Sequence, residues 1–303
     1  MEAGRFIDGD RPGRPETPLL SNPGSDRVRA VRRLAGRSAR QRERRFVAEG
    51  PQAVTEAVDA TVAAVTAGRP PVVLELYATA DAAARHPEVL EAARLAGVPP
   101  RTATDQVLAA MADTVTPQGL LAVCALVDVP LATVLAGRPA LVAVLAHVRD
   151  PGNAGTVVRA ADAAGAGGVV LSDASVDVHN PKCVRASAGS IFHLPVATGE
   201  LLVPALHELR AAGLRVYAAD VSGDLDLDDL LDAVEDGEPG GLADPVAWVF
   251  GNEAWGLPHE ALAASDGVVR VPVHGRAESL NLATAATVCL YASARAQRRR
   301  PRS

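Results

Sequence analysis

The segment HGRAESLNLATAATVCLY, residues 274–291, concentrates polar side chains just before a run of small and apolar residues that predicts a helix. A helix buried in a protein core does not need Glu278, Ser279 and Asn281 together at its first turn. Free backbone N–H groups and the helix dipole at an N-terminus favour a carboxylate, a phosphate or an oxyanion. The cluster therefore predicts a polar site, although Ser279 alone would also suit a simple helix cap.

Three further segments place polar residues after predicted strands. Asn153 and Arg159 lie in DPGNAGTVVRAAD, and a third segment reads GNEAWGLP. Asn180, Lys182, Arg185 and Ser187 lie in VHNPKCVRASAGS. The sequence contains neither the GxGxxG nor the GxxxxGK[ST] motif, which argues against nicotinamide dinucleotides and ATP. Glycines without a phosphate cradle suit a ligand held by its adenine, ribose and amino-acid ends, and S-adenosylmethionine fits that description.

The second half of the chain alternates between strand and helix patterns. Strands are expected at 140–148, 167–173, 191–197, 214–220, 246–251 and 267–273, and helices at 152–167, 181–190, 201–212 and 279–296. The first of these helices should open at Asn153 and stop at its glycines. This rhythm predicts an α/β fold, a parallel sheet with helices on both faces. Ligands of such sheets bind beyond the carboxyl ends of the strands, where the polar segments lie.

The whole chain divides into two predicted domains. Residues 1–25 hold several Pro and Gly and little apolar content, which predicts a disordered N-terminus. Residues 26–128 begin with an arginine-rich helix and continue with helix and strand patterns, so a small α/β domain is expected. Residues 129–139 are interpreted as a linker with a short helix. Residues 140–303 form the second domain, with an acidic surface insertion at 222–244.

The formal net charge of −6 conceals a strong segregation of charge. Residues 27–45 hold nine arginines against the single acid Glu43, whereas residues 220–244 hold ten acids and no base. A cationic stripe of this density is typical of a nucleic-acid partner, although a solvated helix face or a disordered arm would show the same pattern. The acidic segment lacks the EF-hand spacing, so no metal is expected there.

The remaining composition narrows the class of protein. The three cysteines lie far apart and outside CxxC spacing, which disfavours disulfides and a cysteine zinc site. The histidines His147, His179 and His274 have no partner at metal spacing. The sequence has no run of about 18 uncharged apolar residues and no signal-peptide pattern. We therefore expect a cytoplasmic protein with no membrane partner and no metal.

Three segments resemble, in order and spacing, the motifs of the SpoU (TrmH-like) family of RNA ribose 2′-O-methyltransferases, part of the SPOUT superfamily. They are DPGNAGTVVRAADAAG, FGNEAWGL and VPVHGRAESLNLATAAT. NPKCVRASAGSIFHLPV and VTPQGLLAV also look like family segments, and RRFVAEGPQAV looks like the start of the family's RNA-binding domain, which resembles a ribosomal protein. The resemblance implies a SPOUT domain with a C-terminal trefoil knot, a rare exception among folds. It also implies S-adenosylmethionine as the cofactor and a homodimer.

The resemblance assigns roles residue by residue. The knot would be formed by 250–256, 271–275 and 279–281, and glycine at 251 and 275 would let the ligand approach the backbone closely. The implied cofactor-binding residues are Phe250, Gly251, Asn252, Gly256, Val271, Pro272, Gly275 and Leu280. The implied catalytic residues are Asn153, Arg159, Glu253, Ser279 and Asn281. RNA binding is expected from Arg27, Arg29, Arg32, Arg33, Arg40, Arg44, Arg45, Asn180, Lys182 and Arg185.

The implied reaction is displacement of the donor's methyl group by a ribose 2′-hydroxyl. The family mechanism makes Arg159 the base, helped by an RNA phosphate. An arginine pKa above about 12 keeps the side chain protonated, so a clamp that fixes the phosphate and stabilises the alkoxide is an equally good interpretation. Asn153 would orient its loop and Glu253 would brace the knot. Trp255 departs from the small or basic residues expected there, and should cover the pocket rather than stack on a base.

The separate N-terminal domain with its arginine arm favours ribosomal RNA, and 23S rRNA in particular, over tRNA as the substrate. The alternatives are a tRNA 2′-O-methyltransferase and a non-catalytic RNA-binding protein that kept the fold. The presence of all five implied catalytic residues favours the enzyme. Binding of S-adenosylmethionine would discriminate the enzyme from the scaffold.

Overall fold

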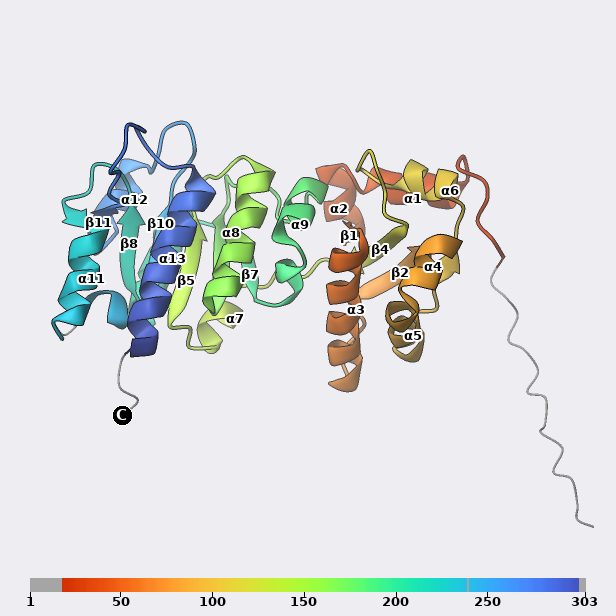
Figure 1. Ribbon diagram of the computed structural model, residues 1–303, viewed down its shortest axis with the longest axis horizontal. Coiled ribbons are helices and arrows are strands. Elements are labelled where there is room, and N and C mark those ends of the chain that lie inside the picture. Colours follow the sequence, from red (N-terminus) through yellow and green to blue (C-terminus); the bar gives the residue numbers. More distant parts are fainter. Residues whose placement is uncertain (1–17, 239, 300–303) are drawn as a thin grey trace, which may run out of the picture.

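The computed structural model describes residues 18–238 and 240–299, which form two α/β domains side by side (Figure 1). Residues 1–17 of the predicted disordered N-terminus lie outside the described residues. For residues 20–25 that prediction is wrong. The backbone N–H of Leu20 donates to Thr102, and Ser25 caps the first helix through a hydrogen bond from Val28. Leu20 is held because it packs against the apolar core of the first domain.

The first domain surrounds a four-stranded sheet of order β1-β4-β2-β3, in which β4 runs antiparallel to β1 and β2. Its strands are β1 (Arg45–Glu49), β2 (Val73–Ala78), β3 (Arg101–Thr102) and β4 (Leu120–Ala125). Its helices are α1 (Asp26–Arg33), α2 (Arg37–Glu43), α3 (Pro51–Thr66), α4 (Ala80–Arg85), α5 (Pro87–Leu95) and α6 (Asp105–Met111). The predicted single arginine-rich helix is therefore two helices. Successive i to i+3 hydrogen bonds at 34–36 close α1, and Gly36 is the N-cap of α2.

The second domain contains a seven-stranded sheet of order β7-β6-β5-β10-β8-β11-β9. All neighbouring strands in it are parallel, which confirms the predicted fold class. The strands are β5 (Leu141–Leu145), β6 (Gly168–Ser172), β7 (Val196–Glu200), β8 (Arg215–Ala219), β9 (Leu225–Asp226), β10 (Val246–Phe250) and β11 (Gly267–Arg270). The strand predicted at 191–197 begins later than expected, because Ser190–Phe192 forms a short 3-10 helix, η1. A second 3-10 turn, η2, spans Gly241–Ala243.

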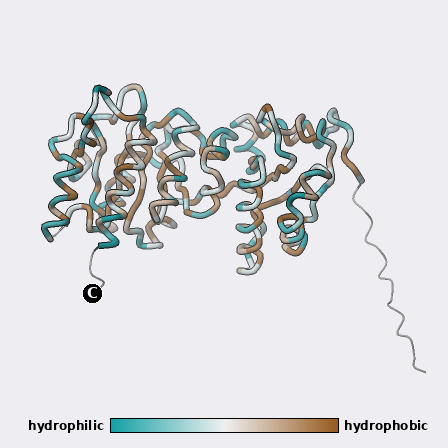
Figure 2. The backbone as a smooth tube through the Cα atoms, in the orientation of Figure 1, coloured by the Kyte–Doolittle hydropathy of each residue, from teal (hydrophilic) through white to brown (hydrophobic). Residues whose placement is uncertain are grey.

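Helices cover both faces of this sheet. They are α7 (Leu131–Ala136), α8 (Pro151–Ala164), α9 (Pro181–Ser187), α10 (Leu202–Ala211), α11 (Leu227–Glu235), α12 (His259–Ala263) and α13 (Leu282–Arg299). Helices α8, α9, α11 and α13 pack on one face of the sheet (Figure 1). Helices α7, α10 and α12 pack on the other face. Every residue of β5 is buried, with alternate side chains entering the two cores. Apolar residues run along the strands in Figure 2, as expected for a sheet buried on both sides.

The segment at 129–139 does not act as a separate linker. The N–H of Val129 donates to the carbonyl of Val196 at 2.9 Å, so the segment continues the edge of the second sheet. Leu131 and Val134 of α7 are buried in the core on one face of that sheet. Because of these apolar contacts the segment belongs to the second domain, which therefore begins near residue 129 and not at residue 140.

The acidic segment at 222–244 is also more than a surface insertion. Its strand β9 extends the sheet beside β11, and its helix α11 lies against α13. Arg270 pairs with Asp226 at 3.0 Å. Arg295 and Arg299 both pair with Glu235, at 2.6 and 2.7 Å. Part of the acidic charge is thus matched by arginines of the same domain.

The two domains share a continuous apolar core at their junction. The ring of Phe46 in β1 lies 4.8 Å from that of His179 and 5.9 Å from that of Phe192, both in the second domain. Beside them the buried side chain of Arg40 donates to the carbonyl of Leu34 and pairs with Asp177 at 2.7 Å. Burial opposes ionisation of Asp177, but hydrogen bonds from His179 and Arg40 hold its pKa well below the usual range.

This environment overturns the expectation that Arg40 binds RNA. Its side chain is only 2% exposed, and its guanidinium is directed to a carboxylate and two carbonyls of the protein itself. A buried cation needs such partners, since an unpaired charge in the interior is strongly destabilising. Arg40 is therefore a structural residue of the domain junction.

A second ionic contact joins the domains at His193, and it predicts a pH dependence of stability. The His193 ring contacts Glu56 of α3 at 2.9 Å and Asp162 of α8 at 2.7 Å. Burial lowers the pKa of His193, but the bonds to both carboxylates outweigh it, so the pKa is raised. The protonated ring therefore stabilises the folded state below the ordinary histidine pKa of about 6.5, and this stabilisation is lost as pH rises through the raised pKa.

We expect thermal unfolding to show this dependence. His193→Gln should lower the midpoint at about pH 5.5, and the difference from the natural protein should be smaller at about pH 9, where less of the imidazole is protonated. Differential scanning calorimetry at both pH values measures it. A difference of equal size at the two pH values would contradict the prediction.

Candidate active site

A cavity of about 540 Å³ lies beyond the carboxyl ends of β8 and β10. From β5 the chain runs outward to β6 and β7, then returns to β8 and β10 on the other side of β5. Ligands of parallel α/β sheets bind outside the carboxyl ends of the strands, which is where this cavity lies. Residues from the segments 250–256, 271–275 and 279–281 line this one cavity, as the motifs predict.

Most of the predicted cofactor-binding residues line the cavity. Those that do are Phe250, Gly251, Asn252, Gly256, Val271 and Leu280. Pro272 and Gly275 do not. Val273 of the same segment lines it instead. The trefoil knot implied by the resemblance stays a prediction.

Gly251 and Gly256 form a tight turn at the cavity wall. The backbones of Asn252 and Gly256 exchange two hydrogen bonds of 2.9 Å, and Gly256 has a positive φ of 69°. A Cβ at Gly251 would lie 2.6 Å from the carbonyl oxygen of Gly256 and 2.7 Å from the nitrogen of Leu257. The glycine at 251 is thus required by the geometry of this turn. At Gly275 an added Cβ would meet no atom within 4 Å, so close approach of a ligand there stays a prediction.

A chain of hydrogen bonds joins three of the predicted catalytic residues. Asn281 Nδ2 donates to Asn153 Oδ1 at 3.2 Å, and Asn153 Nδ2 donates to Glu253 Oε1 at 3.0 Å. The three residues belong to three different motifs, and Asn153 is 100 residues from Glu253 and 128 residues from Asn281 in the sequence. Glu253 and Asn281 line the cavity. These hydrogen bonds therefore fix the three loops relative to one another.

The helix termini beside these hydrogen bonds differ from the sequence predictions. Helix α8 begins at Pro151 with Asp150 as its N-cap, so the helix does not open at Asn153, whose side chain is left for the chain of hydrogen bonds. Helix α13 begins at Leu282, and Asn281 Oδ1 accepts from the N–H of Ala283. The simple interpretation of Ser279 as a cap is therefore wrong. Ser279 lines the cavity, and its hydroxyl makes no hydrogen bond to any described residue.

Arg159 is not brought into the cavity of its own chain. It lies about 9 Å along α8 from Asn153 and is exposed, as is Thr156 one turn earlier. Among the described residues it has no ion pair or hydrogen bond. Its guanidinium is therefore available to a ligand or a partner molecule.

Asp220 is a candidate that the sequence analysis missed. It lines the cavity directly after β8, and its Oδ1 accepts hydrogen bonds from the backbone and hydroxyl of Ser222. The signal that could have found it is its position, the first residue beyond a buried parallel strand. A carboxylate there can accept hydrogen bonds from ribose hydroxyls or from an ammonium group.

The other arginines proposed to bind RNA lie on the first domain's surface. Arg32 and Arg33 are exposed and have no ion pair with a described residue. The rest have carboxylate neighbours: Arg27 and Arg45 with Glu75, Arg29 with Asp26, and Arg44 with Asp128. The arginines of these pairs are 40% or more exposed, and ion pairs of exposed arginines are weak.

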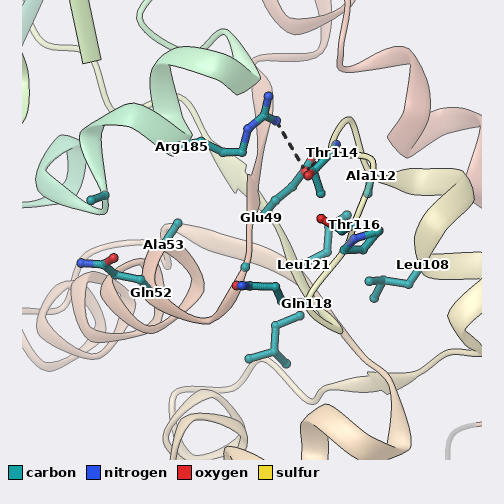
Figure 3. A pocket seen from close by; sticks show the side chains of 14 residues that line it. Glu49, Gln52, Ala53, Leu108, Ala112, Thr114, Thr116, Gln118, Leu121 and Arg185 are labelled. Carbon is teal, nitrogen blue, oxygen red and sulfur yellow. Dashed lines mark hydrogen bonds and ion pairs between the residues drawn. The ribbon is translucent and has the colours of Figure 1, made fainter. Parts of the chain in front are cut away.

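The residues proposed from the 180–187 segment are engaged in different ways. Asn180 caps α9 by accepting from the N–H of Lys182. Lys182 Nζ donates to Asp150 at 2.7 Å, and this bond lowers the pKa of Asp150. Arg185 lies at a second cavity, of about 290 Å³, between the domains (Figure 3). There it contacts Glu49 at 3.6 Å and Asp113 at 3.0 Å, so this arginine links the two domains.

The described residues contain no group of three or more His, Cys, Asp or Glu side chains arranged to hold a metal ion. Within the same residues, no helix is both long and apolar enough to span a bilayer. Cys124, Cys183 and Cys289 are free and buried, and burial raises the pKa of the Cys183 and Cys289 thiols to about 12.

The fold and the cavity together define an α/β protein that has a cavity of small-molecule size at the carboxyl edge of a parallel sheet and carries a separate domain beside it. Residues 140–291 match the SpoU rRNA Methylase family, and residues 25–122 match the MRM3-like substrate binding domain. The chain belongs to the SpoU rRNA methylase family. The resemblance seen in the motifs is thereby confirmed.

Named relatives and solved structures agree with this family. The 23S rRNA (guanosine(2553)-2′-O)-methyltransferase RlmP of Bacillus subtilis (strain 168) is 32% identical over 276 residues, which cover 90% of this chain and 97% of the relative. The 23S rRNA (uridine(2479)-2′-O)-methyltransferase of Streptomyces viridochromogenes is 36% identical over 48% of this chain and 49% of its own. The AdoMet-bound rRNA methyltransferase from Sinorhizobium meliloti superposes with a TM-score of 0.76 at 27% identity, covering 92% of this chain and 98% of that one.

Proposed function

We propose that this protein transfers the methyl group of S-adenosylmethionine to a ribose 2′-hydroxyl of 23S rRNA. The observation that carries the proposal is the hydrogen-bond chain Glu253–Asn153–Asn281, which joins three distant motifs at one cavity. The relative RlmP, which this chain matches over 97% of its length, is named as a 23S rRNA 2′-O-methyltransferase. This supports ribosomal RNA over tRNA as the substrate and, with it, a cytoplasmic location.

The cavity suits S-adenosylmethionine in size and chemistry. Its volume of about 540 Å³ falls within the range of about 300–1,000 Å³ typical of small-molecule sites. Phe250, Val271 and Leu280 supply apolar walls for the adenine, and Asp220 supplies an acceptor for hydroxyl or ammonium groups. The bound cofactor would supply a methyl group activated by a positive sulfur. The glycine turn at 251 brings backbone groups against the ligand without an intervening side chain.

The residues of this chain then act on the ribose hydroxyl. The hydroxyl passes its proton to solvent water as its oxygen attacks the methyl group, so developing negative charge on the oxygen must be stabilised. We assign that role to Arg159, which acts as a phosphate clamp and not as a base, because a guanidinium stays protonated. Ser279 at the cavity wall positions the sugar through its free hydroxyl. Asn153, Glu253 and Asn281 hold the loops in register.

A homodimer is part of the proposal. The exposed faces of the neighbouring helices α8 and α13 carry Arg159 and Thr156 on the first, and Val288 and Tyr291 on the second. Val288 and Tyr291 are 39% and 49% exposed, although they are large apolar side chains. A second copy packed here would cover them and would bring Arg159 to the cavity of its partner. This explains why Arg159 lies outside the cavity of its own chain.

Two measurements test the function. Calorimetry with S-adenosylmethionine should show one site per chain, and 2′-O-methyl mapping in a deletion strain should show the loss of one methyl group in 23S rRNA. Loss of a tRNA methyl group instead would identify tRNA as the substrate. If S-adenosylmethionine does not bind, the enzyme is excluded and only an RNA-binding scaffold remains.

Ser279→Ala should reduce the turnover number by about tenfold, the effect of one hydrogen bond to a polar or charged group. The melting temperature should not change, because Asn281 and not Ser279 caps α13. Methyl incorporation into a 23S rRNA transcript measures turnover, with the exposed Ser21→Ala as a matched control. Turnover equal to that of the natural protein would exclude a role for this hydroxyl.

A further inference from the structure

Arg149 and Trp255 form an exposed stacked pair at the rim of the cavity. Trp255 lies between Ala254 and Gly256, which both line the cavity, but it does not line the cavity itself. It is 54% exposed, and the guanidinium carbon of Arg149 lies 4.9 Å from the centroid of its ring. This position does not support the expectation that Trp255 covers the pocket. A large aromatic ring is left in solvent at the mouth of the site.

The backbone beneath the pair is firmly held. Arg149 follows β5 and Trp255 follows β10, and these two strands are paired in parallel up to Leu145 and Phe250. Asn252 Nδ2 donates to the carbonyl of His147 at 2.8 Å, which ties the two loops together. The two hydrogen bonds between Asn252 and Gly256 close the turn that carries the tryptophan. Hydrogen bonds therefore fix the two loops that carry the ring and the guanidinium.

We propose that Arg149 and Trp255 form a stacking subsite for the base of the RNA nucleotide whose ribose is methylated. The inference rests on the proposed function, since it needs an RNA nucleotide at this cavity. An aromatic ring stacks on the π-face of any base, and an adjacent guanidinium adds cation–π and phosphate attraction. Such a subsite holds the nucleotide beside the methyl donor without reading the identity of its base.

Fluorescence can observe this subsite directly, because the chain has two tryptophans and the other, Trp248, is fully buried. Emission that acrylamide quenches therefore comes from Trp255. We expect quenching in the protein alone and also with S-adenosylhomocysteine. A mixed-sequence oligoribonucleotide should quench the emission and shield it from acrylamide, whereas the same oligonucleotide with abasic riboses should not.

Two variants give a kinetic test with a built-in control. Trp255→Leu should raise the KM for the 23S rRNA transcript about tenfold, within the range expected for one lost stacking contact. Trp255→Phe should retain most of the affinity, because phenylalanine still stacks. Both variants should bind S-adenosylmethionine like the natural protein. In Trp255→Phe the remaining emission comes from buried Trp248 and should not respond to the oligonucleotide.

Three outcomes would overturn the inference. Shielding of Trp255 by S-adenosylhomocysteine alone would make it a cover for the cofactor, and shielding in the protein alone would assign it to contact with a second copy. A KM for Trp255→Leu equal to that of the natural enzyme would exclude stacking in the reaction. If the natural protein binds no S-adenosylmethionine and methylates no RNA, the proposed function itself fails, which is a different result from any of these three.

Discussion

Replacing Arg159 with alanine should abolish methyl transfer while leaving S-adenosylmethionine binding intact. Arg159 lies outside the cavity of its own chain and has no ion pair with a described residue, so its removal leaves the cavity walls unchanged. Removing one group that stabilises a developing oxyanion costs about 100- to 1,000-fold in turnover. Single-turnover methylation of a 23S rRNA transcript, with calorimetry for the cofactor, measures the two effects separately.

Two control variants accompany this prediction, one that keeps the positive charge at position 159 and one that removes an arginine elsewhere. Arg159→Lys keeps the charge but loses the planar fork, and should recover only part of the activity. Arg69→Ala removes another exposed arginine, on the first domain, and should retain full cofactor affinity and turnover. Loss of cofactor binding in Arg159→Ala would refute its assignment to the transfer step.

A mixed dimer tests whether Arg159 acts on the partner's cavity. Subunits carrying Arg159→Ala and subunits carrying Gly251→Ala should each be inactive alone. A dimer of the two would have one intact cavity facing one intact Arg159, so coexpression should restore part of the activity. If the arginine instead served its own chain, every mixed dimer would remain inactive.

Gly251→Ala should eliminate cofactor binding, the second large effect. The added Cβ would lie 2.6 Å from the carbonyl oxygen of Gly256 and 2.7 Å from the nitrogen of Leu257. The colliding atoms are backbone, so the turn between β10 and α12 must open. We expect at least about a hundredfold loss of affinity for S-adenosylmethionine, the result of misplacing several contacts at once.

Gly36→Ala is a matched control for this substitution. Gly36 lies in the first domain, has no positive φ and would place its Cβ in ordinary contact at 3.5 Å. The Gly36→Ala variant should bind the cofactor with the affinity of the natural protein. The far-ultraviolet circular dichroism spectra of Gly36→Ala and Gly251→Ala should match. Normal cofactor affinity in Gly251→Ala would show that the ligand binds elsewhere.

Much of the architecture could be predicted because its signals are local. The apolar run at 140–146, within the strand expected at 140–148, indicates a strand buried on both faces, and the structure has β5 there. Local sequence patterns gave a wrong prediction where tertiary contacts determine which domain a segment joins. The segment at 129–139 has the composition of a linker, yet Val129 and α7 join the second domain through a sheet edge and a core that other strands provide.

The candidate site shows a similar division. Asn153, Glu253 and Asn281 could be selected individually, since each belongs to a motif that follows a strand. Their mutual hydrogen bonds could not, because the partners are 100 and 128 residues apart in sequence. Asp220 was missed for the opposite reason, since its segment carries no motif and only the returning strands make it a cavity residue.

The sequence by itself determined the parallel α/β class, the family and the polar residues at the strand ends, because burial pattern and motif spacing are properties of neighbouring residues. Only the tertiary structure decided which charged groups are free. Arg40 and Arg159 are the same residue type, but Arg40 is neutralised by Asp177, 137 positions away, whereas Arg159 faces solvent. The chemistry available to a charged side chain depends on the groups that folding places beside it, and no local pattern specifies those groups.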